Sequence, residues 1–394
     1  MAVRELHSEM MTLNMGPSHP AMHGTVRMKL TLDGETVVRC DPEIGYLHRG
    51  FEKMCENRTW AQCLPYTDRL NYVSPLINNV GFILALEKLA GARSTPRADH
   101  IRVIISELSR ITDHFTAIAA SALELGGFTP MVWGVEARDH LYNLVEDLTG
   151  ARLTVNYTRV GGVKHDLPAD FEARWREYRD KMLKLHHDID VVLTKNGVFL
   201  DRNEGVGRIS RADAIEHGFT GIVLRSAGEP YDVRRANPYL VYDQLDWTVP
   251  VGSNGDNLDR YLCRMEEILQ SISIVDQCLA RLPGGPFLAP EWAFALPEKE
   301  QVYHTIEGMI AHFEMIMKGM EVPAGEAYGY VEGGNGELGF YLVSDGKGGP
   351  YRCHVRPPCF ALMQGLPLMV EGGMLADIIP TFDSINMIGG EIDR

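Results

Sequence analysis

The spacing of apolar residues changes twice along the chain, and this change limits the fold more than any other feature. Over residues 10–40 apolar and polar residues alternate, as in MTLNM, TVRMKLTL and TVVRC, with the hairpin signal Asp33-Gly34 inside the pattern. From about Phe51 the spacing becomes three and four, which is the period of amphipathic helices. After Pro323 short alternating runs return. The pattern predicts an α+β protein with a helical body and small sheets near both ends of the sequence.

We expect a single large domain over residues 1–394, because neither an internal repeat nor a low-complexity linker divides the chain. Within it, residues 10–40 form an N-terminal β-hairpin region, residues 51–320 a helical body and residues 324–394 a C-terminal β-rich region. The helical patterns fall at 100–127, 134–150, 168–195, 257–282 and 299–317.

The charge balance and the apolar runs exclude some classes of partner. There are 53 acidic and 38 basic residues, a formal net charge of −15, which argues against nucleic acid or an anionic bilayer as the main partner. Apolar tracts such as VGFILALEKLAGA are too short to span a bilayer. The seven cysteines form no CxxC pair, and the start MAVRELHSEMMTLN lacks a signal-peptide core. We expect reduced thiols, a cytosolic compartment and any membrane role to come through partner proteins.

The stretch GPSHPAMHG, residues 16–24, places His19 and His23 in a loop between the first two strands. The simplest interpretation is a turn histidine that is solvated or bonded to the backbone. A structural zinc site lacks ligands, because no cysteine or second histidine pair lies nearby in sequence. A third interpretation is a proline-stiffened loop that presents one imidazole to a ligand as a hydrogen-bond donor and proton source.

The predicted helix at 100–127 carries a polar stripe with two interpretations. A solvated face of an amphipathic helix is the simpler one. The stripe is sparse and contains alanine and serine rather than lysine, which also suits a helix that contacts protein or a polar cavity on both sides. Its members are Glu107, Arg110, His114, Ser121 and Glu124.

Two further kinds of stretch bear on a site. In PYTDRLNYV, Arg69 and Tyr72 lie three residues apart, on one face if the segment is helical, and a buried tyrosine hydroxyl needs a partner. The glycine-rich pieces EGGNGELG and DGKGGP lack the strand, loop and helix order of a phosphate loop and are predicted to be turns. The residues alone indicate an α+β protein with a candidate site of histidine, tyrosine and an acid.

Several segments, taken in chain order, resemble the D-subunit family of respiratory NADH:quinone oxidoreductase, also called complex I or NDH-1. The similarity runs from about residue 10 to Arg394 and is specific because the segments keep their order. The segments are MTLNMGPSHPAMHG, IGYLHRGFEKMCENRTW, PYTDRLNYV, IRVIISELSRI, RVGGVKHDLP, YDVRRANPY, ELGFYLVSDG and GGEIDR.

The wider relatives are the large subunits of nickel–iron hydrogenases, and HRGFEKMCENR is similar to the stretch before their first nickel-binding cysteines. Where those proteins have R-x-C-G-x-C this chain has DRLNYV, and TFDSINMIGGEIDR replaces their C-terminal D-P-C-x-x-C. Between Cys63 and Cys263 there is no cysteine. A nickel centre requires thiolate ligands. The resemblance therefore implies a nickel–iron hydrogenase large-subunit-like fold with no metal site and no hydrogenase activity.

The resemblance also implies a role and a set of site residues. Family members belong to the peripheral arm, form the quinone headgroup cavity with the adjacent iron–sulfur subunit and support two-electron, two-proton quinone reduction. The loop histidine of the family falls on His23, the headgroup tyrosine on Tyr72, and the acid behind the histidine on Glu124, where aspartate is more usual. Arg69 and His114 match residues near the partner's terminal cluster.

Cofactors and partners follow from the same resemblance. The chain itself is expected to bind no cofactor; the 4Fe-4S cluster lies in the neighbouring subunit, with NADH and FMN elsewhere in the complex. The implied partners are a B-like iron–sulfur subunit, C-like and I-like peripheral subunits and an H-like membrane-arm subunit, at the cytoplasmic face of the inner membrane. The alternative function is a non-catalytic scaffold that docks the iron–sulfur subunit on the membrane arm.

Overall fold

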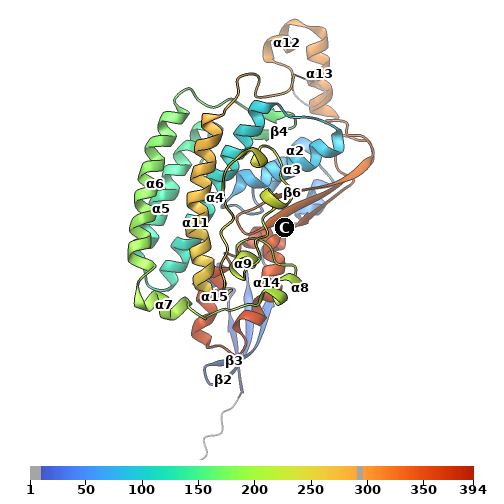
Figure 1. Cartoon of the computed structure of the whole chain (residues 1–394). Helices are drawn as coiled ribbons and strands as arrows, with labels where there is room; N and C mark the ends of the chain where they lie inside the picture. Colours follow the sequence, from blue (N-terminus) through green and yellow to red (C-terminus); the bar gives the residue numbers. More distant parts are fainter. Residues whose placement is uncertain (1–9, 291–295) are drawn as a thin grey trace, which may run out of the picture.

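The computed structural model describes residues 10–290 and 296–394. Residues 1–9, which are most of the stretch considered for a signal peptide, and residues 291–295 lie outside the described part. A bundle of long helices forms one side of the molecule, and two small sheets lie beside and below it (Figure 1). The fold is therefore mixed, mainly helical with small sheets, as the apolar spacing predicts.

The N-terminal sheet has three antiparallel strands in the order β1-β2-β3. They are β1 (Met10–Met15), β2 (Arg27–Asp33) and β3 (Thr36–Glu43). Asp33 pairs with Thr36 across the predicted hairpin turn, and Gly34 has a φ of 60°, a left-handed conformation that glycine adopts without strain. The predicted hairpin region is confirmed, and the histidine-bearing loop joins β1 to β2.

The helical body is built on five long helices, which Figure 1 shows running side by side or packed on the C-terminal sheet. α4 packs against both α5 and α11, and α5 packs against α6, so α4 lies inside the bundle. α3 packs against the C-terminal sheet. Their bounds are α3 (Pro75–Ala90), α4 (Pro96–Glu124), α5 (Phe128–Thr149), α6 (Phe171–Leu193) and α11 (Asn257–Ala280).

The polar stripe on α4 is not a solvated face over most of its length. Glu107, Arg110 and His114 are 0% exposed, because α11 and the segments beside it cover this side of the helix. The simpler interpretation of the stripe is therefore wrong for these three residues, and contact with protein on both sides is confirmed. Ser121 and Glu124, near the end of α4, are half-buried.

The C-terminal part divides into a sheet and a helical segment. Strands β6 (Gly325–Glu332), β7 (Glu337–Ser344) and β8 (Arg352–Arg356) form an antiparallel sheet in that order. The expected β-rich region over 324–394 thus ends at Arg356. Two prolines follow, and they cannot donate to a sheet ladder, whereas a proline in the first turn favours a helix. The helices are α14 (Pro358–Val370), α15 (Ile378–Ser384) and α16 (Gly389–Asp393).

The remaining elements are short. The helix expected over 299–317 is broken at Thr305, whose side chain accepts a hydrogen bond from the Gly308 amide and so begins a new helix. The short elements are α1 (Phe51–Cys55), α2 (Trp60–Thr67), β4 (Thr158–Arg159), β5 (Gly162–Val163), α7 (Gly197–Asn203), α8 (Arg211–Glu216), α9 (Gly221–Ser226), α10 (Val233–Ala236), α12 (Lys299–His304) and α13 (Ile306–Met317).

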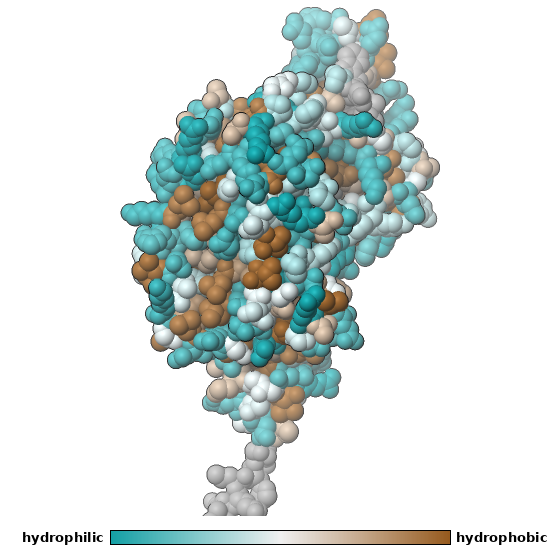
Figure 2. All heavy atoms as spheres, in the orientation of Figure 1, coloured by the Kyte–Doolittle hydropathy of each residue, from teal (hydrophilic) through white to brown (hydrophobic). Residues whose placement is uncertain are grey.

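Helices α12 and α13 project from the body at the end opposite the N-terminal sheet (Figure 1). The visible surface of the molecule is mostly hydrophilic with smaller apolar areas between (Figure 2). α13 exposes large apolar side chains, among them Ile306, Phe313 and Met317. Among the described residues, no helix combines the length and the apolar character needed to cross a membrane.

Two hydrophobic cores hold the fold together. The larger one fills the helical body and the C-terminal sheet, around Trp60, Phe115 and Trp175. The smaller one joins the N-terminal sheet to α14, α15 and α16, and it includes Met28 and Phe382. Burial of apolar surface on this scale is the main source of stability. The candidate site lies where these two cores adjoin.

α3 lies directly on strand β6, and Gly329 permits this close approach. A Cβ at Gly329 would lie 2.6 Å from the Cα of Ala85 in α3. We predict that Gly329→Ala lowers the free energy of unfolding by about 2 kcal/mol through overpacking. Thermal unfolding of the purified protein measures this change. Gly197→Ala is the control, because a Cβ there meets no atom within 4 Å, and equal melting temperatures for the two variants would contradict the prediction.

Candidate functional site

His23 and Tyr72 line one cavity of about 290 Å³. This volume is near the lower end of ligand pockets, which begin at about 300 Å³. The lining is largely apolar and aromatic with a few polar groups, as in pockets that bind small molecules. The other lining residues are Val73, Thr116, Ala120, Arg138, Tyr142, Leu153, Phe382, Asp383, Asn386, Met387 and Ile388.

The loop that carries His23 is anchored by its own residues. A single turn, Pro20–Met22, buries Ala21 and Met22 completely. The Ala21 amide donates to Nδ1 of His19 at 3.2 Å, so His19 has the local structural role expected of a turn histidine. His23 follows the turn with a φ of 54° in the left-handed region. The loop therefore presents His23, and not His19, to the cavity.

A buried carboxylate lies beside the imidazole of His23. Nε2 of His23 is 3.9 Å from Oδ1 of Asp383, whose side chain is 2% exposed. The His23 ring also stacks on Phe382, with 6.2 Å between the ring centroids. The pairing with Asp383 raises the pKa of His23, burial of the ring acts in the opposite direction, and Glu124 adds a smaller upward contribution.

Tyr72 is positioned by hydrogen bonds from its neighbours to one aspartate of α4. Asn71 Nδ2 and Ser74 Oγ donate to Oδ2 of Asp113 at 2.8 and 2.7 Å. Asn386, which also lines the cavity, donates to the other oxygen at 2.6 Å. Asp113 thus ties the Tyr72 segment and the C-terminal segment to α4. Burial raises the pKa of Tyr72, so its hydroxyl is neutral and able to donate.

Arg69 and Tyr72 do not share a helical face, because α2 ends at Thr67 and turns follow. Arg69 Nη1 pairs with Oδ2 of Asp68 at 3.0 Å, and the Arg69 side chain is 46% exposed. Burial raises the pKa of Asp68 to about 6 despite this arginine. Arg69 therefore faces outward and is accessible to a partner protein, while Tyr72 faces the cavity.

Glu124 and His114 lie outside the cavity lining. Glu124 is half-buried at the end of α4, and burial, followed by the charge of Asp383, raises its pKa. His114 is fully buried, with Nε2 at 2.7 Å from Oε2 of Glu267. Burial lowers the pKa of His114 although Glu267 favours its charged form. Any influence of His114 on a partner's cluster would therefore act through the protein interior.

Behind α4, His114 belongs to a larger buried ion network. Arg225 pairs with Glu332 at 2.7 Å and with Glu267 at 3.2 Å. Arg234 pairs with the same Glu267 at 2.6 Å. Buried charges are tolerated only when they are paired and hydrogen-bonded. The fully buried members are Glu107, Arg110, His114, Arg225, Asp232, Arg234, Glu267 and Glu332.

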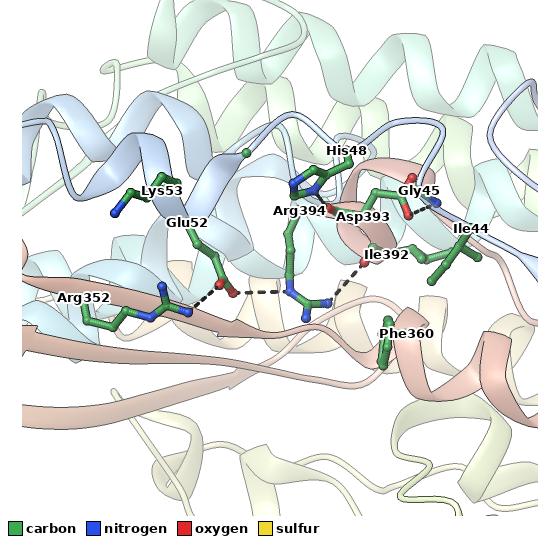
Figure 3. A pocket seen from close by; sticks show the side chains of 11 residues that line it. Ile44, Gly45, His48, Glu52, Lys53, Arg352, Phe360, Ile392, Asp393 and Arg394 are labelled. Carbon is green, nitrogen blue, oxygen red and sulfur yellow. Dashed lines mark hydrogen bonds and ion pairs between the residues drawn. The ribbon is translucent and has the colours of Figure 1, made fainter.

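A second cavity, of about 330 Å³, lies at the C-terminal residue (Figure 3). Glu52 accepts from Arg352 and Arg394, each at 3.3 Å, and these pairs are drawn in Figure 3. The Asp393 carboxylate accepts from the amides of Gly45 and Leu47. These charged groups pair with one another and hold the end of the chain in place. We therefore take the cavity of His23 and Tyr72 as the candidate site.

Sequence reasoning missed Asp383, Phe382 and Asn386 as site residues. The run TFDSIN has no chemical signature that separates its aspartate from a surface one. Within residues 10–290 and 296–394, no group of three or more His, Cys, Asp or Glu is arranged to hold a metal ion. All seven cysteines are buried and free of disulfides.

The fold and the site define a class: a mainly helical protein with an enclosed, largely apolar ligand cavity that carries an imidazole and a phenol. A family described as respiratory-chain NADH dehydrogenase, 49 Kd subunit, matches residues 124–394. The chain is 54% identical to the D subunit of NADH-quinone oxidoreductase from Myxococcus xanthus (strain DK1622), covering 99% of this chain and 94% of the relative. The chain belongs to this family of 49 kDa, or D-subunit, proteins.

Two other relatives extend the comparison. The D 1 subunit of NADH-quinone oxidoreductase from Sorangium cellulosum (strain So ce56) is 55% identical over 99% of this chain and 97% of its own length. The C/D subunit of NADH-quinone oxidoreductase from Bdellovibrio bacteriovorus is 48% identical over 99% of this chain and 70% of its own length. The resemblance of the ordered segments is thus confirmed over nearly the whole chain.

Proposed function

We propose that this chain is the quinone-site subunit of a proton-pumping NADH:quinone oxidoreductase and supports two-electron, two-proton reduction of a quinone headgroup. The observation that carries the proposal is that His23 and Tyr72, from separate parts of the sequence, line the same cavity. The relatives are named as subunits of an NADH-quinone oxidoreductase, which supplies the class of reaction.

The residue types suit this chemistry. Reduction of a quinone places negative charge on its two carbonyl oxygens, and hydrogen-bond donors stabilise the reduced form more than the quinone. Tyr72 is a neutral donor because burial raises its pKa. His23 is readily protonated because its carboxylate neighbour raises its pKa. The electrons come from the 4Fe-4S cluster of the neighbouring iron–sulfur subunit.

Three further residues take part in the proposal. Glu124 lies near enough to His23 to favour its charged form. Arg69, with its exposed guanidinium, faces the neighbouring subunit, where a positive charge favours the reduced, more negative cluster. His114 acts at longer range, because it is buried in the ion network behind α4.

The assembly follows from the family. The chain is a single domain of nickel–iron hydrogenase large-subunit-like fold in which the metal site has been lost, and it binds no metal or prosthetic group itself. It contacts B-like, C-like, I-like and H-like partners and is held at the cytoplasmic face of the inner membrane. The relative named as a C/D subunit supports the C-like partner, since both letters belong to one protein there.

Replacement of His23 tests the proposal against the scaffold alternative. In the assembled complex we expect His23→Ala to lower the affinity for a quinone analogue and the rate of quinone reduction by about tenfold, since a hydrogen bond to a charged group contributes about 1.5 kcal/mol or more. Electron transfer from NADH to ferricyanide should be unchanged. His19→Asn is the control, because it keeps an acceptor for the Ala21 amide in the same loop.

The result that contradicts the proposal is equally clear. A His23→Ala complex with wild-type affinity for the analogue and wild-type quinone turnover would support a scaffold. In that case the cavity would be a packing feature between the two cores, and the subunit would only hold its iron–sulfur neighbour against the membrane arm.

A further inference from the structure

Asp383 is a buried acid at the cavity with an unsatisfied oxygen. It belongs to α15 and lines the cavity with His23. Its side chain is 2% exposed, Oδ1 lies 3.9 Å from His23 Nε2, and Oδ2 has no hydrogen-bond partner within the described part of the chain. A buried carboxylate without full hydrogen bonding is costly. Its presence beside the cavity therefore points to a partner that binds there or to a role in the site.

We propose that Asp383, and not Glu124, is the carboxylate that orients His23 and keeps its imidazole charged in the quinone site. Asp383 is then a positioning residue, because it acts through His23 and not on the quinone. The inference rests on the proposed function and refines it. It assigns the acid of the site to the C-terminal segment, about as far along the chain from His23 as the sequence allows.

The geometry separates the two acids. Asp383 is buried, and its distance to His23 falls within the range of an ion pair. Glu124 is half-buried and does not line the cavity. The charge of a half-buried acid is screened by solvent, whereas that of a buried acid is screened much less. Asp383 therefore dominates the electrostatics of the imidazole.

α15 contributes a second contact that fits the same role. Phe382, next to Asp383 in sequence, stacks on the His23 ring with an angle of 24° between the ring planes. The stacking limits rotation of the imidazole while the carboxylate fixes the direction of Nε2. Together these two neighbours hold His23, which sits on a surface loop and is 46% exposed at its side chain.

The charged and titratable groups around His23 come from four elements. The β1–β2 loop contributes His19, α4 contributes Glu124, α5 contributes Arg138 in the cavity wall, and α15 contributes Asp383. The carboxylate of Asp383 raises the pKa of His23, and burial lowers it. Removal of that carboxylate leaves burial as the main effect. The pKa of His23 then falls, and the protonated imidazole is lost at a lower pH than in the wild type.

The test is the pH dependence of quinone reduction by the assembled complex. We expect Asp383→Asn to move the alkaline limb of the kcat profile to lower pH by about one unit, because an opposite charge at this distance shifts a pKa by about 1–3 units. Asp383→Glu keeps the charge and should restore most of the shift. Glu124→Gln should move the limb by less than half as much. Electron transfer from NADH to ferricyanide reports assembly in each variant.

Three results would overturn the inference: an Asp383→Asn profile equal to the wild type, a Glu124→Gln shift as large as that of Asp383→Asn, or the same shift in Asp383→Glu. If Asp383→Asn does not assemble, Asp383→Ser removes the same charge with a smaller side chain. The proposed function fails separately, when His23→Ala leaves quinone turnover intact. If His23→Ala reduces turnover while Asp383→Asn keeps the wild-type profile, only this inference fails.

Discussion

Replacement of Tyr72 by phenylalanine should lower the rate of quinone reduction by about 100-fold. The variant loses one hydroxyl and keeps the ring, so packing against the smaller core is preserved. What it removes is a neutral donor aimed at a carbonyl oxygen that becomes negative during reduction. Removal of one such donor costs about 100-fold to 1000-fold in kcat in other enzymes, and loss of a proton donor has effects of about the same size.

The control for Tyr72→Phe is Tyr66→Phe. Tyr66 lies in the preceding helix and packs edge-on against Phe51, outside the cavity lining. Its loss of a hydroxyl should leave quinone reduction within about twofold of the wild type, as expected for a site away from the chemistry. Both variants should transfer electrons from NADH to ferricyanide at the wild-type rate. Wild-type quinone turnover in Tyr72→Phe would contradict the role given to this phenol.

Local signals predicted most of the elements. Alternation and the Asp33-Gly34 turn located the N-terminal sheet, and helical spacing located the long helices of the body. The failures have local causes as well. The run YRCHVRPPCF predicts only a short strand, yet Pro358 within it begins α14. Thr305, which caps α13, gives no stop signal inside a continuous helical pattern.

The site was less accessible to sequence reasoning. The proline-rich loop indicated that one histidine would be presented to a ligand, and the loop is placed at the cavity. The choice of Tyr72 required the family resemblance, because tyrosines held by local packing are common. Asp383 could not be found from the sequence, since its contact with His23 joins opposite ends of the chain. Such a contact exists only once the smaller core has assembled.

The polar stripe on α4 shows why burial cannot be inferred from polarity alone. A polar face usually faces water. Here Arg225 and Arg234, which follow much later in the sequence, neutralise the acids that surround α4. A charged residue can be buried when its counter-charge is buried with it, and that counter-charge leaves no local signal in the helix itself. The structure therefore places inside the bundle a stripe that the sequence alone favours as solvated.

Arg225→Met should be the most destabilising of these substitutions. The guanidinium of Arg225 is 0% exposed and lies against three carboxylates, those of Asp232, Glu267 and Glu332. Methionine fills similar space but leaves these acids with too little positive charge. Removal of one partner from a buried ion pair costs about 3–5 kcal/mol. We expect a lower melting temperature of the assembled complex and a smaller amount of complex recovered from cells.

The pH dependence of this loss identifies its cause. Without Arg225 the pKa values of its partner carboxylates rise above those of the unfolded chain, since burial already raises the pKa of Glu332. Protonation then relieves the repulsion at low pH, so the destabilisation should be larger at pH 8 than at pH 6. Arg176→Met, which removes an exposed partner of Glu172, should cost less than about 1 kcal/mol at either pH. Equal effects of the two substitutions, or a loss that does not change with pH, would mean that Arg225 stabilises the fold by packing and not by neutralising buried acids.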